Sequence, residues 1–341
     1  MSNKNINQIF EALTPRTKQK EKTFHNILMQ SQVEHKRQRR IPPMKPVRYA
    51  MLATVLMVCL TTTAFAAAYM GLDEAFIKFL KPANNEQTEY LSNGAYVVDK
   101  TVENEYGSLT IKQVIGDGNL TYILMDFTAP EGTVLNAARY RFDTSITTNQ
   151  SFHSTGFEVL NDGNPNDNKI SLVMNIMTDS SLADQTVNLK LYDLQAADLF
   201  PGNFETIIPG PWETSFKLEF KEYSTLYQID KSFTMFGYTA ILKTISVSPI
   251  SITLKINSGS LKEINAATRF KEIGPNEYLD DFPITINYKD GTSETTSIFT
   301  GLALSNYMSN QLLTIKTFED VINDKQITSI VFFDKEIPID K

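Results

Sequence analysis

A run of 22 residues without one charged side chain, Tyr49–Met70, constrains this chain more than any other feature. A helix needs about 20 predominantly apolar residues to cross the hydrocarbon core of a bilayer. Tyr49 and Tyr69 stand near the two ends of the run, where aromatic rings favour the lipid interface. The run therefore predicts one transmembrane helix at residues 49–70.

The charges on the two sides of this run have opposite signs. Residues 1–48 carry 11 basic and three acidic side chains, whereas residues 71–341 carry 21 basic and 36 acidic ones. The net charge is therefore +8 before the run and −15 after it. Because basic residues resist translocation, we expect the tail 1–48 in the cytoplasm and residues 71–341 outside the cell membrane.

Three other interpretations of the apolar run stay open. A buried core helix rarely extends this far without a charge. A cleaved signal peptide fits the small residues that end at Ala66 and Ala68, although the long tail before the run is unusual for one. A lipoprotein would acylate Cys59, but the residue before it is Val58 rather than a small one. Cys59 is the only cysteine, so no intrachain disulfide can form.

The tail 1–48 reads as two short amphipathic helices. Apolar residues recur at helical spacing in the first, and Thr14-Pro15 is typical of a helix start before the second. So short a segment cannot bury a core of its own. Its apolar faces therefore favour a partner surface, either another protein or the membrane. The residues that we predict to contact a partner are Ile9, Phe10, Leu13, Phe24, Ile27 and Leu28. A partly disordered tail that only sets topology is the alternative.

The periodicity of the chain changes after the apolar run. Gly71–Leu80 is predicted as a short amphipathic helix, and apolar residues then alternate with polar ones, as in strands. Gly116–Asn119 and Asp290-Gly291 are typical of β-hairpin turns. Pro209–Trp212 interrupts the pattern, and strand-like alternation resumes after it.

These patterns predict a mainly β fold. Short strands separated by turn residues, without long helices, favour immunoglobulin-like β-sandwiches. We place a boundary near residue 222, which gives one extracytoplasmic β domain at 71–222 and a second at 223–341. A single large sheet is the less favoured alternative.

Signals for catalysis and for metal binding are thin. Of the three histidines only His153 follows the apolar run, so a histidine metal cluster or a Ser-His-Asp site would depend on it alone. The loop Asp162–Asn168 offers oxygen ligands, but Asp167 and Val173 stand where an EF-hand needs Gly and Glu. We therefore expect no catalytic residues, no cofactor and no metal. We also expect no direct nucleic-acid binding, because anionic lipid explains the basic cluster beside the span.

Five segments carry a family resemblance: TPRTKQKEK at 14–22, GLDEAFIKFL at 71–80, NGAYVVD at 93–99, LTIKQVIGDG at 109–118 and TAPEGT at 128–133. In this order they resemble bacterial membrane-bound anti-sigma-factor-like proteins, which regulate extracytoplasmic-function sigma factors. The resemblance implies an uncharacterised domain after the span and a C-terminal immunoglobulin-like domain. The tail departs from the zinc-binding anti-sigma domains, which use His and Cys ligands, because it has no cysteine. Any contact with a sigma factor would therefore be made without zinc by the two short helices.

The leading hypothesis is a non-enzymatic, single-pass membrane regulator. Its outer region would bind an unidentified extracytoplasmic ligand, and its tail would bind a sigma factor beside the membrane lipid. The alternative is a cell-surface adhesion or ligand-binding protein with no transcriptional role. An envelope hydrolase would need carboxylates that converge around His153. The sequence identifies neither the stimulus, nor the sigma factor, nor the oligomeric state.

Overall fold

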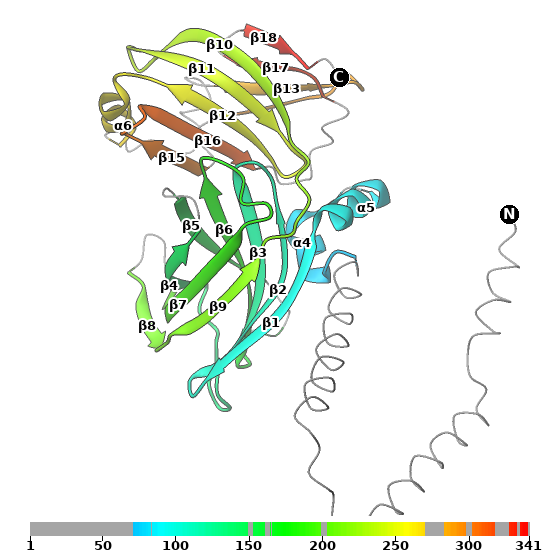
Figure 1. Cartoon of the computed structure of the whole chain (residues 1–341), viewed down its shortest axis with the longest axis vertical. Coiled ribbons are helices and arrows are strands. Elements are labelled where there is room, and N and C mark those ends of the chain that lie inside the picture. The colour runs from blue at the N-terminus through cyan, green and yellow to red at the C-terminus, as the bar shows by residue number, and fades with distance from the viewer. Residues whose placement is uncertain are drawn as a thin grey trace, which may run out of the picture. The chain divides into compact units, whose positions relative to one another are not determined.

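The computed structural model of the chain (Figure 1) describes residues 71–82, 84–148, 153–160, 164, 166–198, 203–269, 283–297, 302–317, 327–332 and 335–339. These residues all belong to one compact unit of the chain. The predicted tail 1–48 and the predicted span 49–70 lie outside them. Within the described residues, the helices are all too short or too polar to cross a bilayer.

The described chain is mainly β, as predicted, and is built from antiparallel sheets. Sheet A has the order β1 (Tyr96–Asn104), β2 (Gly107–Gly116), β3 (Leu120–Thr128), β6 (Lys169–Thr178) and β5 (His153–Leu160). In sheet B, β7 (Thr186–Ala197) pairs with β4 (Arg139–Thr147), β8 (Glu205–Ile208) and β9 (Trp212–Lys217).

The later part of the chain forms two further sheets. Sheet C has the order β10 (Thr225–Met235), β11 (Tyr238–Val247), β12 (Ser251–Asn257), β16 (Gln311–Thr317) and β15 (Leu302–Asn306). Sheet D has the order β14 (Ser293–Ser297), β13 (Pro283–Tyr288), β17 (Ile327–Phe332) and β18 (Lys335–Pro338). The described helices are α4 (Glu74–Leu80), α5 (Asn85–Gly94) and α6 (Leu261–Arg269).

The first core lies between sheets A and B. Alternate apolar residues of β2, β3, β6 and β7 meet there around Trp212, which is 2% exposed and is the only tryptophan of the chain. The Nε1 of Trp212 donates a hydrogen bond of 3.0 Å to the carbonyl of Gly107. Lys100 on β1 donates a bond of 2.6 Å to the carbonyl of Ser215 on β9. These bonds tie the two sheets together on the β1–β9 side.

The second core lies between sheets C and D. Alternate residues of β11, β12, β13 and β17 supply most of its side chains, and Leu261 and Ile264 of α6 complete it. Both α6 residues stand three positions apart, so they share one face of the helix. The first core is built from residues before β10 and the second from residues of β10 onward, so the chain passes from one sheet pair to the other between β9 and β10.

A third core covers the opposite face of sheet A. Strand β3 shows how the sequence produces it, because alternate residues of this strand point to opposite faces. Its odd-numbered residues Ile123, Met125 and Phe127 enter the first core, whereas Leu120, Tyr122 and Leu124 enter the third. The residues that pack on this face are Phe76 and Leu80 of α4, Leu91 of α5, Ile250 before β12, and Leu313 and Ile315 of β16 in sheet C. The third core therefore joins the two helices and both sheet pairs (Figure 1).

The segment that follows the predicted span is fastened to β2. The side-chain amide of Gln113, which is buried, accepts a bond of 2.8 Å from the N–H of Asp73 and donates one of 2.8 Å to the carbonyl of Gly71. The carboxylate of Asp73 caps α4 by accepting from the N–H of Ala75, and it forms an ion pair of 2.8 Å with Lys112. Gln113 thus holds the backbone at Gly71 and Asp73, and its neighbour on β2, Lys112, holds the carboxylate that caps α4.

A buried carboxylate joins the two sheet pairs. Asp117, in the β2–β3 turn, is 3% exposed. Its Oδ1 accepts from the N–H groups of Asn119 and Leu120, at 2.9 and 2.8 Å, as in many Asx turns. Its Oδ2 accepts from the hydroxyls of Ser248, which follows β11, and of Ser251, the first residue of β12, each at 2.6 Å. Burial raises the pKa of Asp117 above its usual range, although these four bonds oppose that effect.

Several local predictions are confirmed. The helix at 71–80 is present as α4, and both predicted hairpin turns connect paired strands, β2 with β3 and β13 with β14. Residues 209–211 separate β8 from β9, as the break in pattern predicts, and Trp212 already begins β9. The predicted domain boundary near residue 222 stays a prediction; this residue lies between β9 and β10. The loop around Asp167 forms a hydrogen-bonded turn, in which its carboxylate accepts from Asn164 and from the N–H of Lys169.

Candidate functional site

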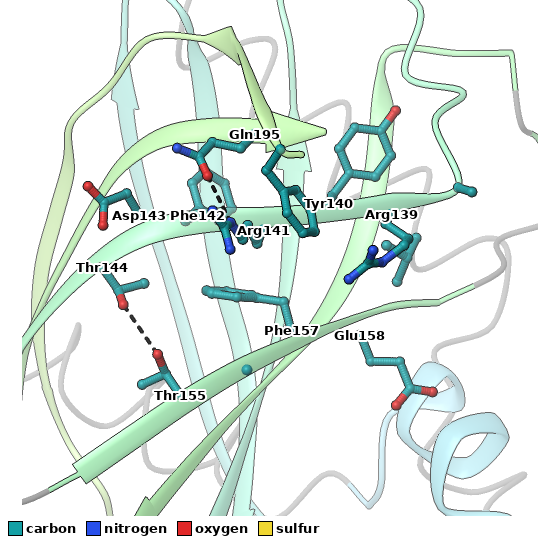
Figure 2. Close-up of a pocket in the computed structure, with 14 residues that line it drawn as sticks. Arg139, Tyr140, Arg141, Phe142, Asp143, Thr144, Thr155, Phe157, Glu158 and Gln195 are labelled. Atoms are coloured by element: carbon teal, nitrogen blue, oxygen red, sulfur yellow. Dashed lines mark hydrogen bonds between the residues drawn. The ribbon is translucent and has the colours of Figure 1, made fainter. Parts of the chain in front are cut away.

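A cavity of about 840 Å³ opens where the outer strands of sheets A and B approach each other. Its walls come mainly from β4 and β5, with Gln195 of β7 and Phe204 before β8 (Figure 2). Each of these two strands ends its sheet, so the edge that faces the cavity has no ladder partner in the described chain. We call this cavity the arginine groove. Its volume lies within the range of about 300–1,000 Å³ that is usual for ligand sites.

Two guanidinium groups gather on one ring in the arginine groove. The guanidinium carbons of Arg139 and Arg141 lie 4.8 and 4.1 Å from the centre of the Phe204 ring. The Nε of Arg141 donates a bond of 2.8 Å to Gln195, its partner across the β4–β7 pair. A guanidinium has five N–H donors in a planar fork that fits a carboxylate or a phosphate. The pair therefore forms a preorganised site for an anionic group.

The floor of the arginine groove is rigid. The ring of Phe142 packs on Phe157 of β5 with centroids 6.0 Å apart and on Trp212 with centroids 5.7 Å apart. Farther along the groove, the hydroxyls of Thr144 and Thr155 lie 3.3 Å apart and bridge the two strand edges (Figure 2). Aromatic packing of this kind fixes the side-chain rotamers of the packed rings and so holds β4, the strand that carries the arginines, in place.

A second cavity, of about 760 Å³, lies beside α4 and the end of β5. We call it the helix groove. Its walls include Phe79 and Lys81, Leu160, and Glu158 with Val159, and the last two also line the arginine groove. Partial burial raises the pKa of the Glu158 carboxyl, and the charge of Lys81 lowers it. Strand β5 therefore contributes side chains to both cavities.

Most cations of the helix groove already have anionic partners. Lys78 pairs with Glu74 at 3.0 Å, and Lys112 pairs with Asp73 at 2.8 Å. Burial lowers the pKa of Lys112, but its bonds and charge contacts with Asp73 and Asp126 outweigh burial, so its pKa is raised. Two of the three lysines of the helix groove are thus held in ion pairs.

The described residues include no group of three or more His, Cys, Asp or Glu side chains arranged to hold a metal ion. His153, the histidine on which a catalytic site would depend, is the first residue of β5 and is half-buried.

The partner-binding residues predicted from the sequence, Ile9, Phe10, Leu13, Phe24, Ile27 and Leu28, all lie outside the described residues. The two grooves, by contrast, were not predicted from the sequence. The signal that could have revealed them is the repeat of Arg139 and Arg141 two positions apart, between the aromatic residues Tyr140 and Phe142. In a strand this spacing places both arginines on one face.

Comparison with known proteins gives distant likenesses. No family model matches the chain, and no curated protein matches it. The crystal structure of a conserved domain protein from Bacillus anthracis shares 15% identity, with a TM-score of 0.47, over 69% of this chain and 75% of that chain. The N-terminal periplasmic domain of ScsB from Proteus mirabilis shares 10% identity, with a TM-score of 0.20, over 72% of this chain and 96% of that chain. Both likenesses are too distant to indicate a function.

Proposed function

We propose that the chain is a non-enzymatic, single-pass membrane regulator, similar to anti-sigma factors, with its tail in the cytoplasm and its β region outside. The span would cross at 49–70, and the two sheet pairs would be immunoglobulin-like sandwiches. In this proposal the outer region binds an extracytoplasmic ligand. The apolar residues of the tail hold a sigma factor, and its basic cluster lies against membrane lipid.

One observation carries this proposal. The first residues after the predicted span are held against β2 by Gln113 and Lys112, through Gly71 and Asp73. A flexible linker at this point would absorb any movement of the outer region before it reached the membrane. A segment fixed by paired hydrogen bonds and by the burial of Phe76 supports transmission instead.

The arginine groove favours a second function, an adhesion or ligand-binding protein with no transcriptional role. Both functions use the same outer site, and they differ in what the tail does. The adhesion function predicts that the outer region keeps its full activity when the tail is removed.

Co-purification from detergent-solubilised membranes separates the two functions. The full-length chain should capture a sigma factor, and the double variant I27D/L28D should lose it, because charges would replace two apolar anchors. Gln30→Asp, at a polar position of the same stretch, is the matched control and should retain the partner. If no sigma factor is captured and deletion of residues 1–40 leaves transcription unchanged, the regulator proposal fails.

A further inference from the structure

The helix groove contains two opposite charges that stay available to a ligand. Lys81 is the C-terminal cap of α4, Glu158 lies on β5, and both residues are exposed. Burial raises the pKa of the Glu158 carboxyl and the charge of Lys81 lowers it, so the two side chains lie near enough to interact. In the described part of the chain, however, neither of them forms an ion pair, whereas Lys78 and Lys112 both do.

The side chain of Glu158 belongs to the face of sheet A that α4 covers. Leu160, two positions along β5, packs on the third core, and side chains two positions apart share one face of a strand. Figure 2 shows Glu158 directed away from the ring of its neighbour Phe157. Burial, and after it the charges of Asp117 and Glu158, raise the pKa of Tyr122, which lies in the third core. The carboxylate of Glu158 can therefore meet a molecule that enters the helix groove.

Charge complementarity selects a zwitterion for this groove. Its charged walls are three lysines and three carboxylates, so its formal charge is zero: Lys78, Lys81, Lys112, Asp73, Glu74 and Glu158. A purely anionic molecule bound at Lys81 would be repelled by Glu158, and a purely cationic one bound at Glu158 would be repelled by Lys81. A molecule with a negative and a positive group satisfies both side chains.

The position of the helix groove in the chain favours a lipid headgroup. Helix α4 begins at Glu74, directly after the predicted span at 49–70, and its seven residues extend about 10 Å. Gly71 and Asp73 are held on Gln113, so the groove stays close to the point where the proposed span would leave the bilayer. The headgroup layer is about 5–8 Å deep on each side of the hydrocarbon core.

The uncharged walls of the groove also suit a lipid. Phe79, Val159 and Leu160 provide apolar surface beside the two charges, and Phe79 is held by an edge-on contact with Tyr122, with ring centroids 5.0 Å apart. A headgroup whose phosphate lies at Lys81 would bring its glycerol carbons against such a surface. A small polar zwitterion would leave this surface uncovered.

We propose that the helix groove binds the headgroup of phosphatidylethanolamine from the outer leaflet of the membrane. The ammonium of Lys81 binds the phosphate, and the carboxylate of Glu158 accepts hydrogen bonds from the amine of the headgroup. This inference rests on the proposed function for one point only, the span that brings the groove to the membrane. A bound headgroup would fasten α4 to the bilayer surface.

Native mass spectrometry of the full-length chain in non-ionic detergent tests this proposal, because it resolves individual bound lipids. The probes are dioctanoyl phosphatidylethanolamine and dioctanoyl phosphatidylglycerol, which share a phosphate and acyl chains but differ in the amine. We expect saturable binding of phosphatidylethanolamine and weaker binding of phosphatidylglycerol. Lys81→Gln should weaken the binding of phosphatidylethanolamine about tenfold, equivalent to about 1.4 kcal/mol.

Glu158→Gln tests the recognition of the amine. It should weaken the binding of phosphatidylethanolamine about tenfold and strengthen that of phosphatidylglycerol, because the amide does not repel a phosphate. The preference between the two lipids is then lost. The matched controls are Lys231→Gln on β10 and Glu205→Gln on β8, which change exposed charges outside the groove and should keep the preference. Unchanged intrinsic fluorescence of Trp212 in each variant confirms that the first core is intact.

Three results with the lipid probes would overturn the proposal: no binding of phosphatidylethanolamine, equal binding of the two lipids, or an unchanged preference in both groove variants. Free phosphoethanolamine carries the same two charges without acyl chains, and it should compete only at much higher concentration. If it binds as tightly as the lipid, the ligand is a soluble zwitterion and the lipid proposal is wrong.

The proposed span is tested separately, by extraction of membranes with alkaline carbonate. A chain that carbonate releases, but that binds phosphatidylethanolamine through Lys81 and Glu158, would remove the span and leave this site standing. A chain that resists carbonate and shows no preference between the lipids would support the span and overturn the site.

Discussion

Substitution of Ser248 by alanine should destabilise a sheet pair to which Ser248 does not belong. Its hydroxyl donates to Asp117 at 2.6 Å and accepts from the N–H groups of Ile250 and Ser251 at 3.2 and 3.0 Å. Alanine removes one bond to a buried carboxylate and leaves two backbone donors without this acceptor. A hydrogen bond to a charged group contributes about 1.5–3 kcal/mol. We therefore expect the free energy of unfolding to fall by about 2–3 kcal/mol.

The single tryptophan makes this effect measurable at a distance. Trp212 lies in the first core, whereas Ser248 lies between β11 and β12 of sheet C. Urea titration of the full-length chain in non-ionic detergent, followed by Trp212 fluorescence, reports the first core alone. If Asp117 couples the two sheet pairs, Ser248→Ala should shift this transition to lower urea. Asp117→Ala removes all four bonds and should shift it further, by about 3–5 kcal/mol in total.

The matched control is a buried serine that does not reach Asp117. Ser258 is 6% exposed, and its hydroxyl donates to the carbonyl of Thr239 at 2.7 Å, within the second sheet pair. Ser258→Ala should leave the Trp212 transition in place and lower the stability of the second core only. The coupling argument is refuted if Ser248→Ala and Ser258→Ala give the same Trp212 transition as the unsubstituted chain.

Three further outcomes follow from the same structure. Gln113→Leu removes the bonds to Gly71 and Asp73 and should make the amides of α4 exchange with deuterium faster, as hydrogen-exchange mass spectrometry measures, with little change in the first core. Phe76→Ala empties a fully buried position of the third core and should lower the free energy of unfolding by about 3–5 kcal/mol, measured by thermal or urea denaturation. Burial raises the pKa of Asp117 above its usual value of 3.8, so the folded state holds its proton more tightly than the unfolded state. Stability should therefore fall as pH rises from 3.8 through the raised pKa, and Asp117→Asn should flatten this slope in denaturation curves between pH 3 and neutrality.

Elements encoded within a few residues could be predicted from the sequence. The α4 helix carries its cap, Asp73, and its apolar stripe within ten residues, and the β2–β3 hairpin carries its turn in four. Strand β3 was also predictable as a strand. Its burial on both faces was not, because the side chains that cover its second face come from α4, α5 and the strands of sheet C.

The candidate site shows why an edge strand is hard to recognise. The sequence of β5, HSTGFEVL, has no clear alternation of apolar and polar residues, and all its residues except the exposed Glu158 are half-buried. Local periodicity records which face is buried, so it carries little signal there. The partners of Asp117 are 131 and 134 residues away in the chain, and a turn pattern records only local geometry. The predicted tail contacts remain predictions.

The third core also bears on how such a chain can be inherited. Residues 71–95, sheet A and the β12–β16 region of sheet C each supply side chains to this core. A recombination event that moved the first sheet pair into another protein without α4 and α5 would expose Leu120, Tyr122 and Leu124 to water. A recombination event that moved this sheet pair without sheet C would also leave the carboxylate of Asp117 without the hydroxyl donors Ser248 and Ser251. The two sheet pairs, although each has its own core, should therefore be inherited together with α4 and α5 as one segment that begins at Gly71.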